Sequence, residues 1–308
     1  MKSFKNFEDL IRQVKTKPQK KRMAIAAAAD QHIIEAAVRA QQEQVAEPIL
    51  VGNREKITAL FKENRLASSA FPIIDAEKPS EAAEKAVALV KSGEADFLMK
   101  GMLDTKVFLK AVVNKTDGLG QKRTMSHFAW FEVPGYPKLL SVVDGGMVMY
   151  PDLEQKKEII ENTVNTLRTL GYGEPKVGVL ACVEKVNPKM PETLEAAALA
   201  AMNQNGQLAH CIVEGPISFD CAYSAEIAAI KHYKSRIAGD VDILLAPNIH
   251  AGNIMGKMLT CISKAKMAGF VVGAACPIIL TSRGATSEEK YLSIVVAAAA
   301  SKGEGEAK

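Results

Sequence analysis

The stretch ILTSRGATSEEK, residues 279–290, says more about the fold of this chain than any other part of the sequence. Its apolar start predicts a buried strand, which ends at Ser282-Arg283-Gly284 and passes directly into a helix. At the carboxyl end of a parallel strand, this order brings together a hydroxyl, a guanidinium and the free amides of a helix N-terminus. These groups are the parts of a site for a phosphate or a developing oxyanion.

The helix after this turn offers two candidate proton acceptors. Glu288 and Glu289 lie in its first turns, a few residues beyond Ser282. A carboxylate within hydrogen-bond reach of a reacting group can act as a general base. Either glutamate fits this role.

Around this stretch, short β-rich or apolar runs alternate with longer helical patterns along almost the whole chain. The alternation predicts an α/β fold with parallel sheets flanked by helices on both faces. The predicted strands are residues 23–28, 47–51, 71–74, 96–99, 125–131, 139–143, 176–180, 210–213, 242–245 and 277–280. The predicted helices include residues 30–43, 80–91, 153–170, 192–202 and 253–267.

The chain is long enough, at 308 residues, for two domains of ordinary size. The loop-rich sequence NKTDGLGQKR, residues 114–123, precedes a hairpin-like pair of strands and indicates a domain crossing. We expect two αβα-sandwich domains with mainly parallel sheets, a discontinuous one of residues 1–127 and 270–308 and a second of residues 128–269. A cleft between them is then the expected place for the chemistry.

Composition limits the class of partner. The net charge of +4 is mild and falls short of the basic footprint of a nucleic-acid binder. We interpret the basic run KTKPQKKR, residues 15–22, as a solvated linker. The five cysteines form no CxxC pair and no Cys/His cluster, so we expect reduced thiols in a cytoplasmic protein and no metal. No apolar run approaches the roughly 18 residues that cross a membrane.

Other predicted strands also end in polar groups. Lys100 follows one strand and offers a cation for an anion, although a solvated lysine fits as well. Asp144 lies between a buried strand and two glycines, where turn chemistry competes with a role in a site. Ser218 and Asp220 follow the Gly-Pro loop after a further strand. The carboxyl edge of an open α/β sheet is where such proteins bind ligands.

The sequence APNIHAGN, residues 246–253, is the last of these strand ends. Asn248, His250 and the amides near Gly252 are candidates for lining the cleft, while His250 fits equally as a core or surface histidine. Asn253 is expected at a helix N-cap, a structural role. GNIMGK, residues 252–257, falls one residue short of a Walker loop and lacks its Ser/Thr, and no GxGxxG opens a βα turn.

Five of these motifs together resemble the phosphate acetyl/butyryltransferase family. They are KGML at Lys100, VVDGGM around Asp144, EGPISFD at Glu214, PNIHAGNI around Asn248 and TSRGATSEEK around Ser282. Their order and spacing hold over nearly the whole chain. SHFAWFEVP, residues 126–134, looks closer to the butyryl branch than to the acetyl branch.

The resemblance implies a fold similar to the isocitrate and isopropylmalate dehydrogenases, with the active site in the interdomain cleft. It implies transfer of a short acyl group between coenzyme A and inorganic phosphate by direct attack, without a metal, a permanent cofactor or a covalent acyl-enzyme. Acyl-CoA and phosphate would be the partners, with no nucleic acid and no membrane. It also implies a homodimer or higher homo-oligomer.

Residue roles follow from the same resemblance. Ser282 would stabilise the tetrahedral oxyanion, and Arg283, with Gly284 and Lys100, would hold the phosphate. Glu289 falls where the acetyl enzymes carry an aspartate thought to deprotonate the CoA thiol, and Glu288 is an equally plausible base. The expected cleft and CoA-binding residues are Asp144, Ser218, Asp220, Asn248, His250, Gly252 and Asn253.

One position departs from the family pattern. Members often carry asparagine four residues after the aspartate of VVDGGM, and this chain has Val148 there. Loss of that amide would weaken activity unless another residue replaces it. The leading hypothesis is therefore a phosphate butyryltransferase, with a phosphate acetyltransferase or a catalytically weak CoA-binding relative as alternatives. An oxidoreductase would need a nicotinamide site and clustered aspartates, which the sequence lacks.

Overall fold

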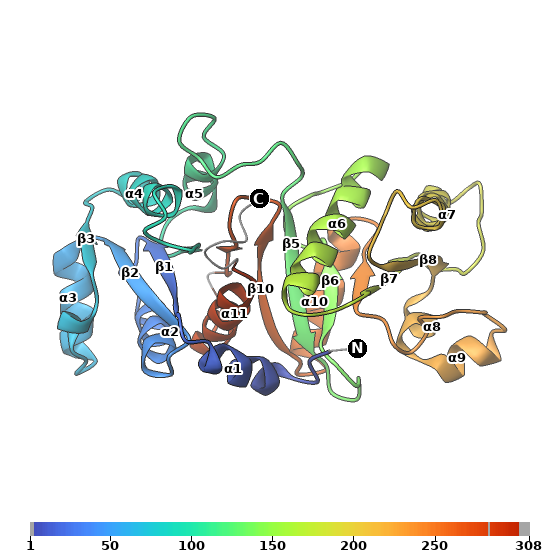
Figure 1. The fold of residues 1–308 in the computed structure, drawn as a ribbon, viewed down its shortest axis with the longest axis horizontal. Coiled ribbons are helices and arrows are strands. Elements are labelled where there is room, and N and C mark those ends of the chain that lie inside the picture. Colours follow the sequence, from blue (N-terminus) through green and yellow to red (C-terminus); the bar gives the residue numbers. More distant parts are fainter. Residues whose placement is uncertain (1–2, 283, 302–308) are drawn as a thin grey trace. The chain divides into compact units, whose positions relative to one another are not determined.

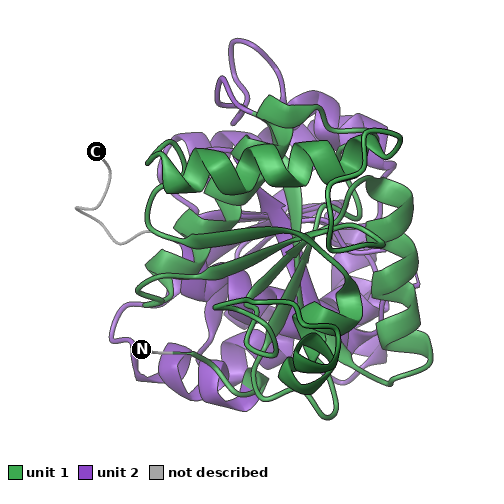
Figure 2. Ribbon diagram, turned by 90° about the vertical axis from the view of Figure 1, so that its right-hand side faces the viewer, with its two compact units in different colours: residues 1–7, 124–267 green, residues 8–123, 268–308 purple. Residues whose placement is uncertain are grey.

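The computed structural model describes residues 3–282 and 284–301. Helices and strands alternate along the chain (Figure 1), so the predicted α/β class is confirmed. The chain divides into two compact units, unit 1 with residues 1–7 and 124–267 and unit 2 with residues 8–123 and 268–308 (Figure 2). The expected domains, 1–127 with 270–308 and 128–269, remain a prediction about independently folding parts.

Unit 2 contains a mostly parallel set of strands in the order β3-β2-β1-β4-β11-β10. They are β1 (Lys21–Ala26), β2 (Ala46–Gly52), β3 (Ile73–Asp75), β4 (Phe97–Lys100), β11 (Ile278–Ile279) and the antiparallel β10 (Lys266–Val272), most of which lies in this unit. Its helices are α1 (Phe7–Thr16), α2 (Gln31–Gln42), α3 (Arg54–Glu63), η1 (Ser68–Ala70), α4 (Pro79–Lys91), α5 (Thr105–Val112) and α11 (Ser287–Ala300).

The last helix, α11, forms the centre of this unit. Every residue from 290 to 299 is buried, so the helix is enclosed on all sides beyond its first turn. It packs against α2. Its start is fixed by Thr286, whose hydroxyl accepts a hydrogen bond from the Glu289 amide at 3.2 Å. The position of the turn before α11 is therefore tied to the core.

Unit 1 has strands in the order β5-β6-β9-β7-β8. They are β5 (Ser126–Glu132), β6 (Leu140–Val143), β7 (Lys176–Leu180), β8 (Ile212–Ile217) and β9 (Ile243–Leu245). The expected hairpin is present because β5 and β6 are antiparallel, and the remaining pairs are parallel. The helices are α6 (Leu153–Thr169), α7 (Pro191–Gln204), α8 (Phe219–Tyr223), α9 (Ala225–Ile230) and α10 (Ile249–Cys261).

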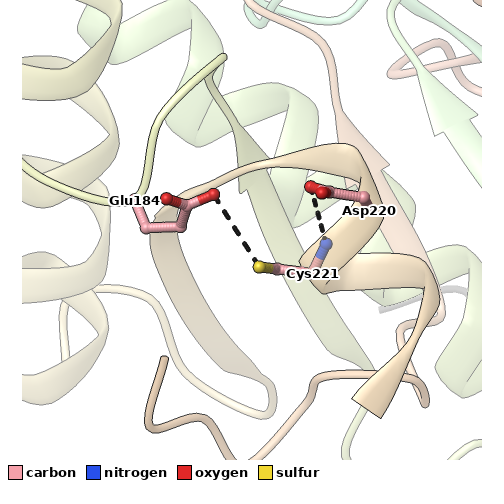
Figure 3. A group of neighbouring side chains, drawn as sticks. All are labelled: Glu184, Asp220 and Cys221. Atoms are coloured by element: carbon pink, nitrogen blue, oxygen red, sulfur yellow. Dashed lines mark hydrogen bonds between the residues drawn. The ribbon is translucent and has the colours of Figure 1, made fainter. Parts of the chain in front are cut away.

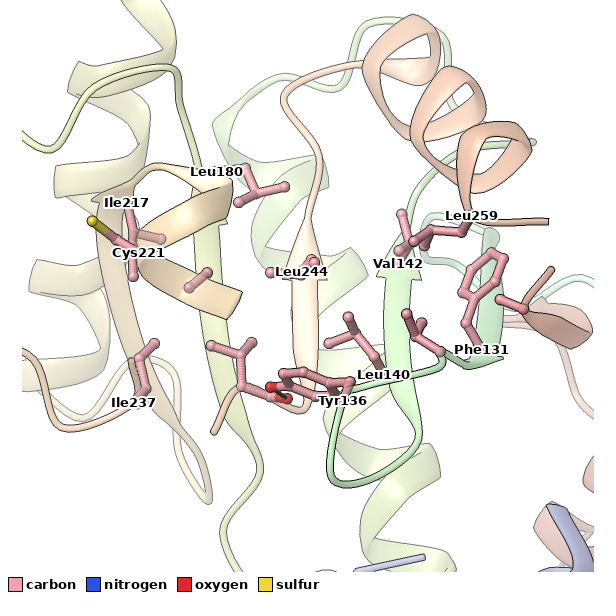
Figure 4. Close-up of a cluster of buried hydrophobic side chains, with 14 of the residues drawn as sticks. Phe131, Tyr136, Leu140, Val142, Leu180, Ile217, Cys221, Ile237, Leu244 and Leu259 are labelled. Carbon is pink, nitrogen blue, oxygen red and sulfur yellow. Dashed lines mark hydrogen bonds between the residues drawn. The ribbon is translucent and has the colours of Figure 1, made fainter. Parts of the chain in front are cut away.

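Alternating apolar side chains of these strands form the core of unit 1. Phe131 of β5, Val142 of β6 and Leu244 of β9 belong to one buried cluster, which Leu259 of α10 joins (Figure 4). Loss of one such side chain to alanine typically lowers the free energy of unfolding by about 2–5 kcal/mol.

The helix expected over residues 253–267 is wrong at both ends. The helix begins four residues earlier, at Ile249, because Asn248 caps it by accepting the Ala251 amide at 3.1 Å. Asn253 is therefore an interior residue of α10 and not its N-cap. The helix ends at Cys261, and the apolar run KMAGFVV forms β10. Periodicity alone does not separate a short buried strand from the end of a helix.

The basic run at residues 15–22 is only partly a solvated linker. Lys15 lies in the last turn of α1, and Lys21 and Arg22 begin β1. Lys21 is buried, and its ammonium is 3.2 Å from a carboxylate oxygen of Asp96. Two of the basic side chains are thus part of the sheet. Within the described residues, no helix is both long and apolar enough to span a bilayer.

Candidate active site

Strand pairing in unit 2 brings two of the expected strand ends side by side. β4 and β11 are parallel, with Leu98 opposite Ile278 and Met99 opposite Ile279. Lys100 and the turn that follows β11 therefore emerge from neighbouring strands at the same edge. The strand-edge prediction for these two motifs is confirmed.

The turn after β11 places its polar groups at the surface. Ser282 is exposed, and its hydroxyl accepts the Gly284 amide at 3.4 Å, while its carbonyl accepts the Ala285 amide at 3.1 Å. A side chain built on Gly284 would meet no atom of the described residues within 4 Å, so the space beside this residue is open on that side. Arg283 lies outside the described residues, and its expected role in phosphate binding stays a prediction.

The two glutamates of α11 are not equivalent. Glu288 is half exposed, and its carboxylate forms an ion pair with the guanidinium of Arg39 from α2. Glu289 is half-buried and occupies the third position of the helix, beside the cap. Sequence analysis missed Arg39, which lies 249 residues before Glu288.

Lys100 is a buried cation. Its side chain is 6% exposed, and its ammonium donates to the carbonyl oxygens of Gly101 at 3.2 Å and Leu103 at 3.0 Å. The alternative of a solvated lysine is wrong. Gly101 is required here because a Cβ atom would lie 2.3 Å from the carbonyl oxygen of Ala27. A second buried lysine, Lys290, donates to the carbonyl oxygen of Ala285 in the turn before α11.

In unit 1, Asp144 orders the turn after β6. Its buried carboxylate accepts four backbone hydrogen bonds, from His127 at 3.1 Å, Gly146 at 2.6 Å, Met147 at 2.9 Å and Val148 at 3.2 Å. Charge-assisted bonds of this kind are stronger than neutral ones. The sequence left open whether Asp144 forms the turn or binds a ligand, and these backbone contacts support the turn-forming role. Val148 contributes its amide to this turn.

The histidine beside this carboxylate was missed at the sequence level. The ring of His127 packs on Gly146, where a Cβ atom would lie 3.2 Å from the ring carbon Cγ. Burial lowers the pKa of His127, and the negative charge of Asp144 opposes this shift. Both neighbours of the His127 ring, Asp144 and Gly146, therefore belong to the motif VVDGGM.

The start of α10 packs directly against this turn. Asn253 donates its side-chain amide to the carbonyl oxygen of Gly145 at 3.0 Å. Gly252 permits the approach, since a Cβ atom there would lie 2.5 Å from the carbonyl oxygen of Asp144. His250 contacts the exposed Tyr150, with 2.9 Å between His250 Nε2 and the phenol oxygen. The structure thus brings together the expected motifs around residues 144 and 248.

A third cluster lies at the ends of β7 and β8 (Figure 3). Ser218 donates its hydroxyl to Glu184 and to Asp220, the latter at 2.5 Å. The ammonium of Lys231 is 2.9 Å from Glu184 and 2.8 Å from Asp220. Hydrogen bonds from Lys231 and then Ser218 lower the pKa of Asp220 to about 2. Hydrogen bonds from Ser218 and then Lys231 lower the pKa of Glu184.

The same cluster bears on the expectation of no metal. Glu184, Asp220 and Cys221 each place one ligand atom within 4.8 Å of the others, a spacing that could hold a cation. The ammonium of Lys231 already pairs with both carboxylates, which reduces their attraction for a metal ion. Glu184 was missed although it follows β7 as the other candidates follow their strands.

Comparison with known families matches residues 6–85 and 78–298 to the phosphate acetyl/butaryl transferase family. Phosphate butyryltransferase of Clostridium acetobutylicum is 40% identical over 295 residues, which are 96% of this chain and 98% of that protein. Phosphate acetyltransferase of Thermotoga maritima is 43% identical over 278 residues, 90% of this chain and 94% of that protein. A branched-chain phosphotransacylase structure from Enterococcus faecalis superposes with a TM-score of 0.81 at 31% identity, covering 91% of this chain and 98% of that one.

Proposed function

The chain belongs to the phosphate acetyl/butaryl transferase family and transfers an acyl group between coenzyme A and phosphate, and we propose that this group is the butanoyl group. The reaction is butanoyl-CoA plus phosphate giving butanoyl phosphate plus CoA. Because the relatives include butyryl and acetyl enzymes, acetyl transfer is the alternative. The expected family, stated from five motifs, is confirmed.

Direct attack in a ternary complex needs few protein groups. A phosphate oxygen forms a bond to the thioester carbonyl carbon, the C–S bond then breaks, and the electron pair leaves with sulfur. The exposed Ser282 hydroxyl and the amides at the start of α11 are suited to the oxyanion, and one preorganised donor contributes roughly 3 kcal/mol. Holding both substrates together makes a covalent acyl-enzyme unnecessary.

The ion pair of Glu288 is the observation that favours a role for Glu289. The carboxylate of Glu288 is already engaged by Arg39, so this guanidinium would have to move before Glu288 could contact a thiol. Glu289, which occupies the position that the family resemblance gives to the base, protonates the leaving thiolate and deprotonates the CoA thiol in the reverse direction. The buried ammonium of Lys100 and the open space beside Gly284 support phosphate binding there, together with Arg283.

Groups of unit 1 are proposed to bind CoA. Asn248, His250 and Asn253 surround the turn that Asp144 orders, so Asp144 and Gly252 act by shaping this surface. Asp220 and its partner Lys231 form a charged surface at the end of β8, and the buried hydroxyl of Ser218 holds Asp220 in place. Coenzyme A and phosphate are substrates in this proposal, and no group is bound permanently.

Two exposed methionines that follow strand ends are candidates for contacting an acyl group longer than acetyl. Met99 is fully buried and belongs to the core, whereas Met102 and Met149 are 60% and 66% exposed. Flexible thioether side chains adapt to apolar groups of different shape. Two additional methylenes in an apolar pocket correspond to roughly 1.6 kcal/mol, about a 15-fold preference.

The remaining expectations stay predictions. They are an isocitrate dehydrogenase-like pairing of two domains with the site in a cleft, a homodimer or higher homo-oligomer, and a cytoplasmic location. One observation supports the oligomer: α10 exposes Ile254 and Met258, and its C-cap residue Ile262, which follows at the same spacing of four residues, is exposed as well. Light scattering on the purified protein would measure the number of subunits.

Release of the CoA thiol from acetyl-, propionyl-, butanoyl- and isobutanoyl-CoA, with and without phosphate, tests the proposed function. We expect phosphate-dependent release that is fastest with four carbons. Fastest release from acetyl-CoA would assign the acetyl reaction instead. CoA binding without phosphate-dependent release from any substrate would contradict acyl transfer and indicate a catalytically silent relative.

A further inference from the structure

Arg39 joins α2 to the first two turns of α11. Its guanidinium forms an ion pair with Glu288, and its Nε atom is 2.8 Å from Glu43 Oε1. Its Cζ atom also lies 3.7 Å from the centre of the Tyr291 ring. The Tyr291 hydroxyl donates to Glu43 Oε2 at 2.8 Å and closes the ring of contacts.

The charges in this cluster are arranged to keep Arg39 in place. Burial alone would lower the pKa of Arg39, but hydrogen bonds with Glu43 and Glu288 raise it. Burial would raise the pKa of Glu43, but hydrogen bonds from Arg39, Lys15 and Tyr291 lower it to about 2. Lys15 of α1 is 2.6 Å from Glu43 Oε2. The guanidinium of Arg39 thus faces the carboxylates of Glu43 and Glu288. The ammonium of Lys15 balances the second negative charge.

Stability alone does not account for this arrangement. The side chains of Arg39 and Glu288 are 40% and 48% exposed, and exposed ion pairs add little to the stability of a fold. The body of α11 is already fixed by burial of residues 290–299. A planar guanidinium that is both paired and stacked on a ring instead fixes geometry, here that of the helix start.

The helix start is also where the proposed chemistry lies. Thr286 caps α11, and the turn before it runs back to Ser282 through the hydrogen bond from the Ala285 amide to the Ser282 carbonyl. Glu288 and Glu289 are adjacent, so the charge of the first acts on the second. The ammonium of Lys290 is turned to the carbonyl oxygen of Ala285, in the same turn.

We propose that Arg39 is a positioning residue for acyl transfer, which holds the first turn of α11 and offsets the negative charge of Glu288 beside Glu289. This inference rests on the proposed role of Glu289 as the general base. Without Arg39, the uncompensated carboxylate of Glu288 raises the pKa of Glu289, because a like charge disfavours the ionised form. The acid limb of the pH–rate profile then moves to higher pH.

The experiment follows CoA acylation by butanoyl phosphate as a function of pH, with thermal melting alongside. In Arg39→Gln, we expect kcat to fall about tenfold with the KM for CoA nearly unchanged, as for loss of positioning. The midpoint of the acid limb of its pH–rate profile should move up by about half a pH unit. Arg39→Gln/Glu288→Gln should return the limb to the wild-type position. Arg12→Gln, which removes an exposed arginine paired with Asp9, is the matched control and should match wild type.

Two results would overturn this inference: an acid limb that stays in place in Arg39→Gln, or one that remains shifted in the double variant. If Arg39→Gln does not fold, Arg39→Lys keeps the charge without the paired and stacked geometry. Its kcat should fall about threefold or more with the limb in place, and an unchanged kcat would contradict the positioning role. Two other results would instead refute the proposed function. One is a wild-type protein that does not transfer the acyl group, and the other is a pH–rate profile of Glu289→Gln that keeps its acid limb.

Discussion

The carboxylate of Asp144 accepts hydrogen bonds from four backbone amides, and it is 2% exposed. A side chain in this position replaces water for four donors at once, so its removal leaves buried amides without an acceptor. At the scale of the residue, sequence reasoning located Asp144 correctly after its strand. It could not decide between turn and ligand roles, because the donors include His127, which lies 17 residues away on another strand.

Asp144→Asn tests this account of the turn. An amide keeps one acceptor oxygen but turns a donor toward other donors, so we expect the free energy of unfolding to fall by about 2 kcal/mol or more. Urea denaturation measures the change. Asp117→Asn is the control, since Asp117 is largely exposed and pairs with Lys91 at the surface. Equal stability of the two variants would contradict the role of Asp144.

At the scale of the element, most strand ends and helix starts were predicted to within two residues, and the exceptions are the end of β8 and the start of α10. The expected strand at 176–180 coincides with β7, and Lys100 and Ser282 emerge at neighbouring strand ends as anticipated. The start of α10 was misplaced because two asparagines, Asn248 and Asn253, carry the same capping side chain. The choice between them depends on packing: Gly252 must lie inside the helix to approach the turn after β6.

Gly252→Ala tests that packing. The added Cβ atom would lie 2.5 Å from the carbonyl oxygen of Asp144 and 2.9 Å from Gly145 Cα, so backbone must shift. We expect a loss of about 2 kcal/mol in the free energy of unfolding despite the higher helix propensity of alanine. Gly173→Ala, where the new Cβ atom meets nothing within 4 Å, should be close to neutral. Greater stability of Gly252→Ala than wild type would contradict this description of α10.

At the scale of the whole molecule, the contacts that sequence analysis missed join distant parts of the chain. Arg39 and Glu288 are separated by 249 residues, and Lys231 reaches Glu184 across 47. Such pairs depend on which helices pack together, and a single sequence contains no direct signal for that. Residue types at strand ends were therefore predictable, whereas their partners were not.

These paired carboxylates predict how stability depends on pH. The pKa values of Glu43 and Asp220 are both lowered to about 2 in the folded protein, below the roughly 4 of an unfolded chain. Their contribution to stability is present above pH about 4.5 and is lost as the pH falls towards about 2. The melting temperature should fall over this window, less steeply in Glu43→Gln/Asp220→Asn. Because both side chains are partly exposed, added salt should reduce the difference. Identical slopes for both proteins would contradict these shifts.

The most direct test of the central claim is a comparison of kcat for CoA acylation by butanoyl phosphate in Glu289→Gln and Glu288→Gln. Because Glu289 is assigned as the general base and Glu288 is held by Arg39, we expect Glu289→Gln to lose about 100-fold or more. Glu288→Gln should stay within about tenfold of wild type, since it loses only positioning. Wild-type activity in Glu289→Gln, with the large loss in Glu288→Gln instead, would contradict the assignment of the site.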